Sequence, residues 1–82
     1  VMEVTVFPNP VSTEAHFVLK NFSGKMTLEL FNTAGQLVFS NKRESSQSIT
    51  ELRIPMQNEP SGLYFWKIST SGQVFSGKFM KQ

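Results

Sequence analysis

The 82-residue chain suits one domain, and its hydrophobic fraction of 39% can fill a single small core. Such a chain buries only about 60–65% of its unfolded surface, and its lack of cysteine excludes disulfides and thiolate metal sites as a source of extra stability. The net charge of +2 includes no basic run beyond Lys42-Arg43, and no apolar run approaches the roughly 20 residues of a membrane span, so we expect neither nucleic-acid binding nor membrane insertion.

Two short strands are predicted in the first 20 residues. The first covers residues 4–7 and ends at Pro8-Asn9-Pro10, where the prolines cannot donate ladder hydrogen bonds and so predict a strand exit at a sheet edge. The second covers residues 14–20, in which apolar side chains occupy alternate positions. Its inward face would hold Ala15, Phe17 and Leu19, and its outward face Glu14, His16, Val18 and Lys20.

A hairpin is predicted in the middle of the chain. Residues 21–24 form a turn, and residues 25–31 then alternate regularly, with Met26, Leu28 and Leu30 inward. The turn at residues 32–35 places Gly35 in the left-handed conformation and leads into a partner strand over residues 36–40. The polar residues 41–48 are predicted to form an exposed loop that could extend the hairpin.

The last third of the chain predicts the central hairpin of the fold. Residues 48–54 form a preceding strand that would bury Ile49, Leu52 and Ile54 through a bulge or bend, because the two-residue period slips there. After a loop at residues 55–60, residues 63–69 and 73–80 pair around a turn in which Gly72 is free to take a positive φ. The core face of the first of these strands would carry Tyr64, Trp66 and Ile68, and its wetter face Leu63, Phe65 and Lys67.

Turn signals recur roughly every 8–12 residues, which is typical of an all-β sandwich or barrel. We therefore predict one domain over residues 1–82, built from about seven antiparallel strands without a helix. Two facing sheets would bury between them Phe17, Leu28, Leu30, Ile54, Tyr64, Trp66 and Ile68.

The residue types needed for catalysis or metal binding are scarce. His16 is the only histidine, aspartate and cysteine are absent, and the six glutamates are scattered, so we predict no catalytic, metal or cofactor site. His16 alternates with the apolar face of its strand and is expected to point to solvent. Asn21-Phe22-Ser23 matches a glycosylation sequon, a pattern that is common by chance. The first four residues lack the features of a signal peptide, so any export information is expected elsewhere.

The aromatic residues leave two questions open. Tyr64 and Trp66 could stack on a sugar ring, although their periodicity favours the core. Phe22, Phe75 and Phe79 fit one core less well, and some of them could form an exposed protein-binding patch. The segment Lys78-Phe79-Met80-Lys81 is either an edge strand protected by lysines or a terminal recognition strand.

Several motifs occur in a specific order along the chain. They are Phe7-Pro8-Asn9-Pro10, the stretch from Leu28 to Val38, Leu52-Arg53-Ile54-Pro55, Ser61-Gly62-Leu63-Tyr64, Gly72 and Lys78-Phe79-Met80-Lys81. In order, spacing and position at the chain end, they resemble the C-terminal sorting domain of type IX secretion system cargo, the type A family, over essentially the whole chain. Gly35 matches the family's turn glycine, Gly62 and Tyr64 its Gly-x-Tyr motif, and Lys78 and Lys81 its terminal lysines. Asn32, where the family often has Asp, and the final Gln82 depart from the pattern.

The resemblance implies a seven-stranded, immunoglobulin-like sandwich that follows a larger secreted cargo protein of a Gram-negative bacterium. The outer-membrane translocon and its shuttle protein would recognise the domain after periplasmic transit. A sortase-like cysteine peptidase would then usually remove it, and the cargo would be joined to surface lipopolysaccharide at the cell surface or released outside. On this basis the domain is an address and not an enzyme.

A small sandwich can also present an edge strand for addition to a partner sheet, and the strand from about Gln73 onward is the candidate. We expect the partner to contact Gly72, Lys78, Phe79, Met80 and Lys81 and the fold to depend on Pro8, Asn9, Pro10, Gly35, Gly62 and Tyr64. The alternative is a carbohydrate-binding or adhesive module of a surface protein. An outward row of aromatic residues would favour that alternative, and a buried row with a bare C-terminal edge would favour sorting.

Overall fold

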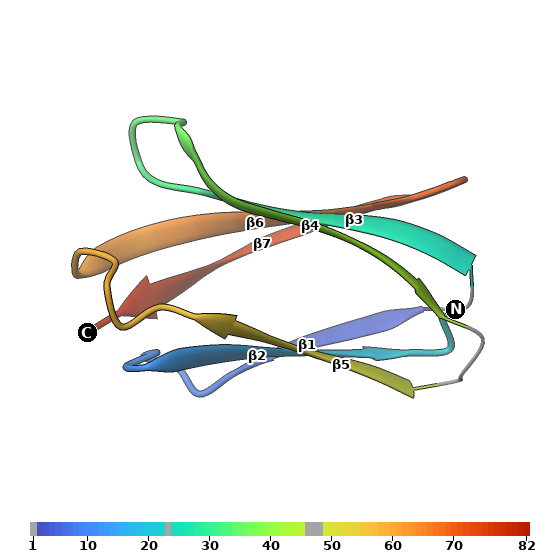
Figure 1. The fold of residues 1–82 in the computed structure, drawn as a ribbon, viewed down its shortest axis with the longest axis horizontal. Coiled ribbons are helices and arrows are strands. Elements are labelled where there is room, and N and C mark those ends of the chain that lie inside the picture. The colour runs from blue at the N-terminus through green and yellow to red at the C-terminus, as the bar shows by residue number, and fades with distance from the viewer. Residues whose placement is uncertain (1, 23, 46–48) are drawn as a thin grey trace.

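Two antiparallel sheets face each other in the computed structural model, which describes residues 2–22, 24–45 and 49–82 (Figure 1). The three-stranded sheet has the order β1-β2-β5 and the four-stranded sheet the order β4-β3-β6-β7. In immunoglobulin notation these are the sheets A-B-E and C′-C-F-G. The strands are β1 (Glu3–Phe7), β2 (Glu14–Lys20), β3 (Gly24–Phe31), β4 (Leu37–Ser45), β5 (Ile49–Pro55), β6 (Gly62–Thr70) and β7 (Val74–Lys81). The predicted all-β sandwich is confirmed, and no helix among the described residues could cross a membrane.

The first sheet follows the predicted alternation. In β2, Ala15, Phe17 and Leu19 are fully buried, while the residues between them lie on the outer face. β1 lies at the edge of this sheet and ends at Phe7, directly before Pro8, as predicted. The two X-Pro bonds that follow, Phe7-Pro8 and Asn9-Pro10, are both cis.

The prediction for β5 was wrong at its first residues. Ile49 is 56% exposed, and Thr50 takes the inward position. The strand pairs with β2 in one continuous register from Lys20 opposite Ile49 to Glu14 opposite Pro55, so no bulge or bend interrupts it. Strict alternation back from Leu52 places Thr50 inside, and this geometry outweighs the greater hydrophobicity of its neighbour Ile49.

The second sheet extends further than predicted. Residues 41–45 are not a loop but continue β4, pairing with β3 as far as Gly24 opposite Ser45. The polar side chains fit because β4 is an edge strand with one face in water. Residues 46–48, the rest of the predicted loop, lie outside the described residues. Gly72 lies in the turn between β6 and β7, but its φ is not positive, and the turn is closed by Thr70 N–H donating to the Gln73 carbonyl at 2.8 Å.

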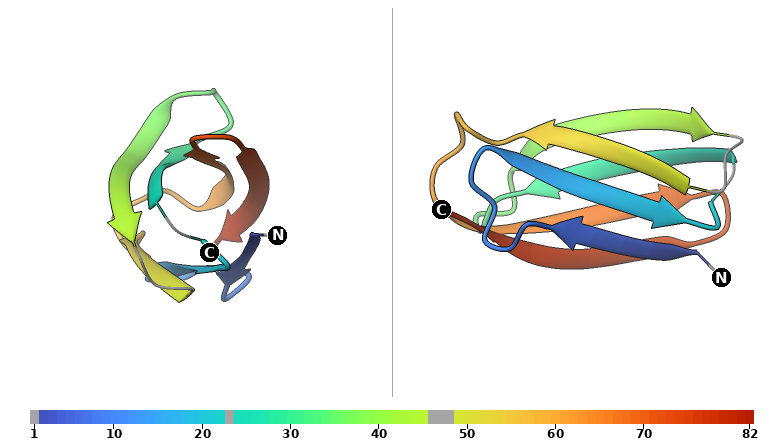
Figure 2. Two further views of the ribbon diagram at one scale, coloured as in Figure 1. Left: turned by 90° about the vertical axis from the view of Figure 1, so that its right-hand side faces the viewer. Right: turned by 90° about the horizontal axis from the view of Figure 1, so that it is seen from below.

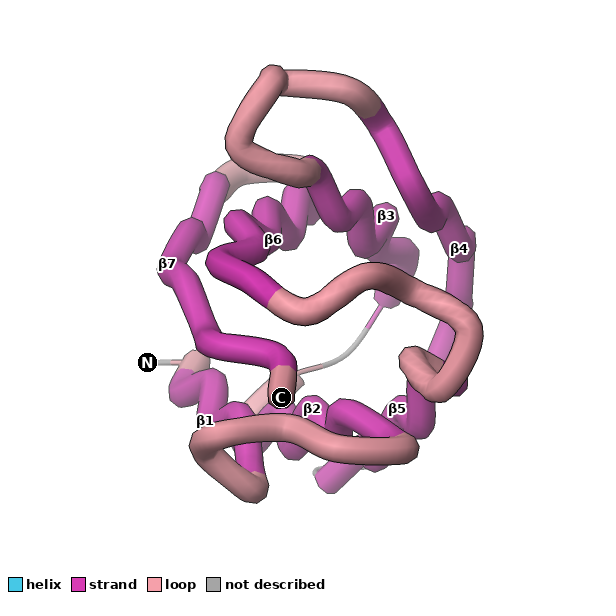
Figure 3. The backbone as a smooth tube through the Cα atoms, turned by 90° about the vertical axis from the view of Figure 1, so that its left-hand side faces the viewer, coloured by secondary structure: helices cyan, strands magenta, loops and turns pink. Residues whose placement is uncertain are grey.

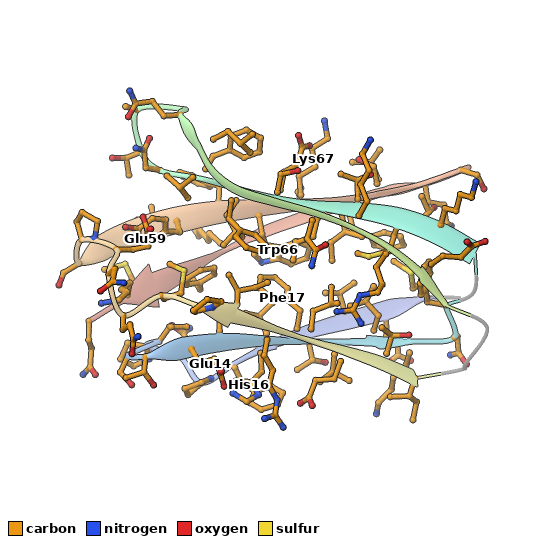
Figure 4. All side chains as sticks on the ribbon, in the orientation of Figure 1. Glu14, His16, Phe17, Glu59, Trp66 and Lys67 are labelled. Atoms are coloured by element: carbon orange, nitrogen blue, oxygen red, sulfur yellow. The ribbon has the colours of Figure 1, made fainter. Side chains whose placement is uncertain are left out.

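The core lies between the sheets, where Phe17 and Trp66 meet (Figure 4). The Phe17 ring contacts Trp66 edge-on with centroids 5.8 Å apart, and it contacts Phe79 at 6.3 Å. All seven residues predicted to fill this space are buried. The predicted exposed phenylalanine patch is wrong, because Phe22 and Phe79 are only 3% and 2% exposed and Phe75 packs against the core.

Candidate functional site

The candidate site is the outer edge of β7. β7 is the last strand of its sheet, and β6 is the one strand that pairs with it among the described residues; Val11 adds an isolated bridge at Lys81. It lies on the same side of the sandwich as β1, whereas β4 lies on the side of β5 (Figures 2 and 3). Because β1 belongs to the other sheet, the ladder hydrogen bonds of β7 on this side are not made to it.

Side chains along β7 alternate between solvent and core. Val74, Lys78 and Met80 are exposed, whereas Phe79 is buried opposite Tyr64, on which its ring stacks at 5.8 Å. Lys81 is only 8% exposed, and its Nζ donates to the carbonyl oxygen of Gln82 at 2.8 Å. The five predicted recognition residues are therefore divided. Gly72, Lys78 and Met80 are accessible, and Phe79 and Lys81 point inward.

The far end of this edge is already closed by the chain itself. Val11, which is fully buried, donates its N–H to the Met80 carbonyl at 2.7 Å and accepts from the Gln82 N–H at 2.7 Å. The Asn9 side-chain oxygen lies 3.5 Å from the Met80 nitrogen. Asn9, predicted to be structural, and Val11, which the sequence did not single out, thus cover the last residues of the edge.

The remaining edge is open over Val74–Lys78. In an antiparallel pair, alternate residues direct both backbone groups to the same side. The backbone groups of Met80 bond to residues 9–11 and therefore face away from β6. The backbone groups of Val74, Ser76 and Lys78, at alternate positions before it, face the same outer side. Among the described residues, no other backbone group bonds to this side of these three residues.

One turn joins β3 to β4 at an end of the four-stranded sheet. Gly35 has φ +80° and donates its N–H to the Asn32 carbonyl at 3.0 Å. The Asn32 side-chain oxygen accepts from Ala34 N–H and Gln36 N–H, both at 3.0 Å. Its amide nitrogen donates to the Gln36 side chain at 2.9 Å, whereas an aspartate at this position could only accept.

Tyr64 fixes the start of β6. Its hydroxyl donates to the Pro60 carbonyl at 2.6 Å, the arrangement known from immunoglobulin-like domains as a tyrosine corner. Burial raises the pKa of Tyr64, and the nearby Glu59 carboxylate raises the pKa further. Gly62, two residues earlier, has φ +145°, a conformation open to glycine.

His16 lies on the outer face of the three-stranded sheet, away from the core (Figure 4). Its Nε2 is 3.0 Å from Glu14 and its Nδ1 is 3.5 Å from Glu51, and its ring stacks on Phe7 at 5.1 Å. The pairing of β2 with β5 brings Glu51 into reach, which sequence spacing could not indicate. The described residues contain no group of three His, Cys, Asp or Glu placed to hold a metal.

The two aromatic residues predicted to stack on a sugar do not form an exposed platform, although Phe31 and Phe65 pair on the outer face of the four-stranded sheet. Tyr64 and Trp66, the two candidates for stacking, are 3% and 9% exposed and face the opposite sheet. Trp66 also covers Gly77 of β7, where a Cβ atom would lie 2.5 Å from the indole ring. This is the buried row with an open C-terminal edge that distinguishes the sorting hypothesis from the carbohydrate hypothesis.

Comparison with known protein families identifies the chain over nearly its whole length. A family model described as the secretion system C-terminal sorting domain matches residues 5–82, which include all of β2 to β7 and most of β1. A search of curated proteins finds no match to this chain.

Proposed function

The chain belongs to the family of secretion system C-terminal sorting domains and is thus a type IX secretion sorting signal, and we propose that its partner recognises the open edge of β7. The partner would add a strand of its own to Val74–Lys78, taking up the outward backbone groups of Val74, Ser76 and Lys78. Exposed Lys78 and Met80 would supply side-chain contacts.

The observation that carries this proposal is the division of the edge. Residues 9–11 already bond to Met80 and Gln82, whereas the backbone groups of Val74, Ser76 and Lys78 on the same side bond to no other described residue. An exposed strand edge is a template for pairing, and natural proteins usually block it. On β7 only one lysine, Lys78, lies on the open segment.

The proposed partners follow from the family. The domain forms the end of a larger cargo protein, passes through the periplasm, and is recognised there by the outer-membrane translocon and its shuttle protein. A sortase-like cysteine peptidase then removes the domain, and the cargo is anchored at the cell surface or released. The domain contributes the address, and its own residues carry out no reaction.

The test separates folding from recognition through a single outward backbone N–H group. Truncation of residues 78–82 would also remove Phe79 from the core, so a point substitution is needed. Ser76→Pro removes the outward N–H of an exposed residue and leaves the ladder with β6 intact, which an edge strand tolerates. Ser76→Ala removes the side-chain hydroxyl and keeps the N–H, and serves as the matched control.

Residues 1–82 carrying each substitution are fused behind a reporter in a host that has the secretion system. We expect the Ser76→Ala fusion at the cell surface or in the medium and the Ser76→Pro fusion in the periplasm. Thermal unfolding of the two isolated domains must show that both are folded. Normal export of a folded Ser76→Pro fusion would refute recognition through this edge.

A further inference from the structure

A groove of about 490 Å³ lies where β3 begins and β4 and β6 end. This end of the four-stranded sheet is opposite the C-terminus (Figure 1). The groove is lined by residues 25–27 of β3, 42–44 of β4 and 69–71, where β6 enters its turn. This volume lies within the roughly 300–1,000 Å³ that is typical of small-molecule sites. The open edge of β7 contributes no residue to it.

The groove carries an excess of positive charge. Lys25, Lys42 and Arg43 line it together with a single carboxylate, that of Glu44. Among the described residues, which include every glutamate of the chain, none of the three cations lies within 4.0 Å of a carboxylate. Their charges are therefore available to an anion from outside.

The opposite surface of the sandwich has the reverse balance. The outer face of the three-stranded sheet presents Glu3, Glu14 and Glu51 against Lys20 and Arg53. There the ion pairs are made, since Glu51 contacts both Arg53 and His16. Of the lysine and arginine side chains on this face, Lys20 makes no ion pair to a described residue, whereas all three in the groove lack one.

The remaining polar groups of the groove are hydroxyls. Thr27, Ser69, Thr70 and Ser71 line it, and of these Thr70 donates its hydroxyl to the Gln73 carbonyl at 3.3 Å. Thr27, Ser69 and Ser71 make no side-chain hydrogen bond to another described residue. The exposed apolar residues of this sheet, Leu37, Phe65, Val74 and Met80, line no part of the groove, and Met26 is the one apolar residue that does.

We propose that this groove binds an anionic saccharide, a sugar that carries a phosphate or carboxylate group. The anionic group would lie between Lys25 and Lys42, whose ammonium groups act as flexible point charges toward a phosphate. The sugar hydroxyls would exchange hydrogen bonds with Thr27, Ser69 and Ser71, each of which can both donate and accept. The groove shares no residue with the open edge of β7, so saccharide binding and sorting can be tested independently of each other.

Binding is tested by titrating the ¹⁵N-labelled 82-residue chain with glucose 6-phosphate, and separately with glucose and with inorganic phosphate. We expect saturable shifts of the amide signals of residues 25–27, 42–44 and 69–71 with glucose 6-phosphate, and at least about tenfold weaker binding of each fragment alone. Absence of saturation by about 10 mM would overturn the proposal. Equally tight binding of inorganic phosphate or of glucose would overturn it too, because one half of the ligand would then contribute nothing.

A pair of double variants separates the groove from general charge. Lys25→Gln with Lys42→Gln should weaken glucose 6-phosphate binding by at least about tenfold. Lys20→Gln with Lys67→Gln removes the same charge from exposed residues outside the groove, and should leave the affinity within about twofold. An equal loss in both double variants would refute a specific site.

Discussion

Tyr64 joins the loop before β6 to the core through one hydroxyl. It is the only tyrosine of the chain, so its ionisation can be followed without interference from another tyrosine. Its pKa is raised above the ordinary value of 10.0 by burial and by Glu59. The protonated form is thus favoured in the folded state, and the hydrogen bond to Pro60 needs that proton.

Folding stability should therefore respond to alkaline pH through Tyr64. Its contribution is fully present below the unfolded pKa of about 10 and is lost as the pH rises through the higher folded pKa. Urea unfolding at a series of pH values should show this loss in the native chain, and the loss should be smaller in Tyr64→Phe. The variant should also be about 1 kcal/mol less stable near neutral pH, since the Pro60 carbonyl loses its donor.

Tyrosinate absorbance of the folded chain provides the independent check. If Tyr64 ionises in the native state at the same pH as in urea, burial does not control it and the expected pH dependence fails.

At the scale of single strands, β7 is held to β6 by an unusually close contact. Gly77 lies under the Trp66 indole, with no room for a Cβ atom at 2.5 Å. The glycine is needed here for space, and its neighbour Ser76 faces outward and has no such restriction. A strand glycine often marks such a close approach.

Gly77→Ala should consequently destabilise the domain by about 1–3 kcal/mol through overpacking against Trp66. Ser76→Ala, one residue away on the exposed side, should change the unfolding free energy by no more than about 0.5 kcal/mol. Urea denaturation monitored by fluorescence of the single tryptophan measures both. Equal stabilities of the two variants would mean that the indole moves aside at no cost.

Alternation along strands explains which parts of the fold could be predicted. It located the inward residues of β2, β3 and β6, because a surface with one wet face imposes a two-residue period. The prediction failed at Thr50 because the hydrophobicity of Ile49 was given more weight than the alternation back from Leu52. It failed at residues 41–45 because a polar edge strand has no apolar period. Phe22 and Met56 are only 3% and 1% exposed, but they lie outside strands, so the two-residue period does not apply to them.

The candidate site was predicted at the level of the strand but not of its residues. The sequence left the lysine-flanked segment open between a protected edge strand and a terminal recognition strand, and β7 is at the edge of its sheet. Which of its groups face outward depends on pairing with Tyr64 and on closure by Val11, both of which are contacts between distant parts of the chain. The sequence carries no local signal for either contact.

For the molecule as a whole, Phe79 links the terminal strand to the opposite sheet. Its ring contacts Phe17 of β2 and stacks on Tyr64 of β6. Phe79→Ala should cost about 3–5 kcal/mol, a large part of the roughly 5–15 kcal/mol by which small domains are stable. Met80→Ala, at an adjacent exposed residue, should cost far less.

Thermal and urea unfolding of these two variants measures the difference. A Phe79→Ala domain as stable as Met80→Ala would show that β7 is dispensable for the fold. In that event a partner could recognise the terminal segment as a free peptide.

The bonds from Val11 to Met80 and Gln82 tie the two ends of the domain into one closure. If residues 9–11 did not dock, the unpaired edge of β7 would extend to its last residues. A longer unpaired edge is more prone to pair with another chain and aggregate. Docking of Val11 thus sets the length of the open edge, because it occupies the backbone groups at the end of β7 that could otherwise pair with another strand.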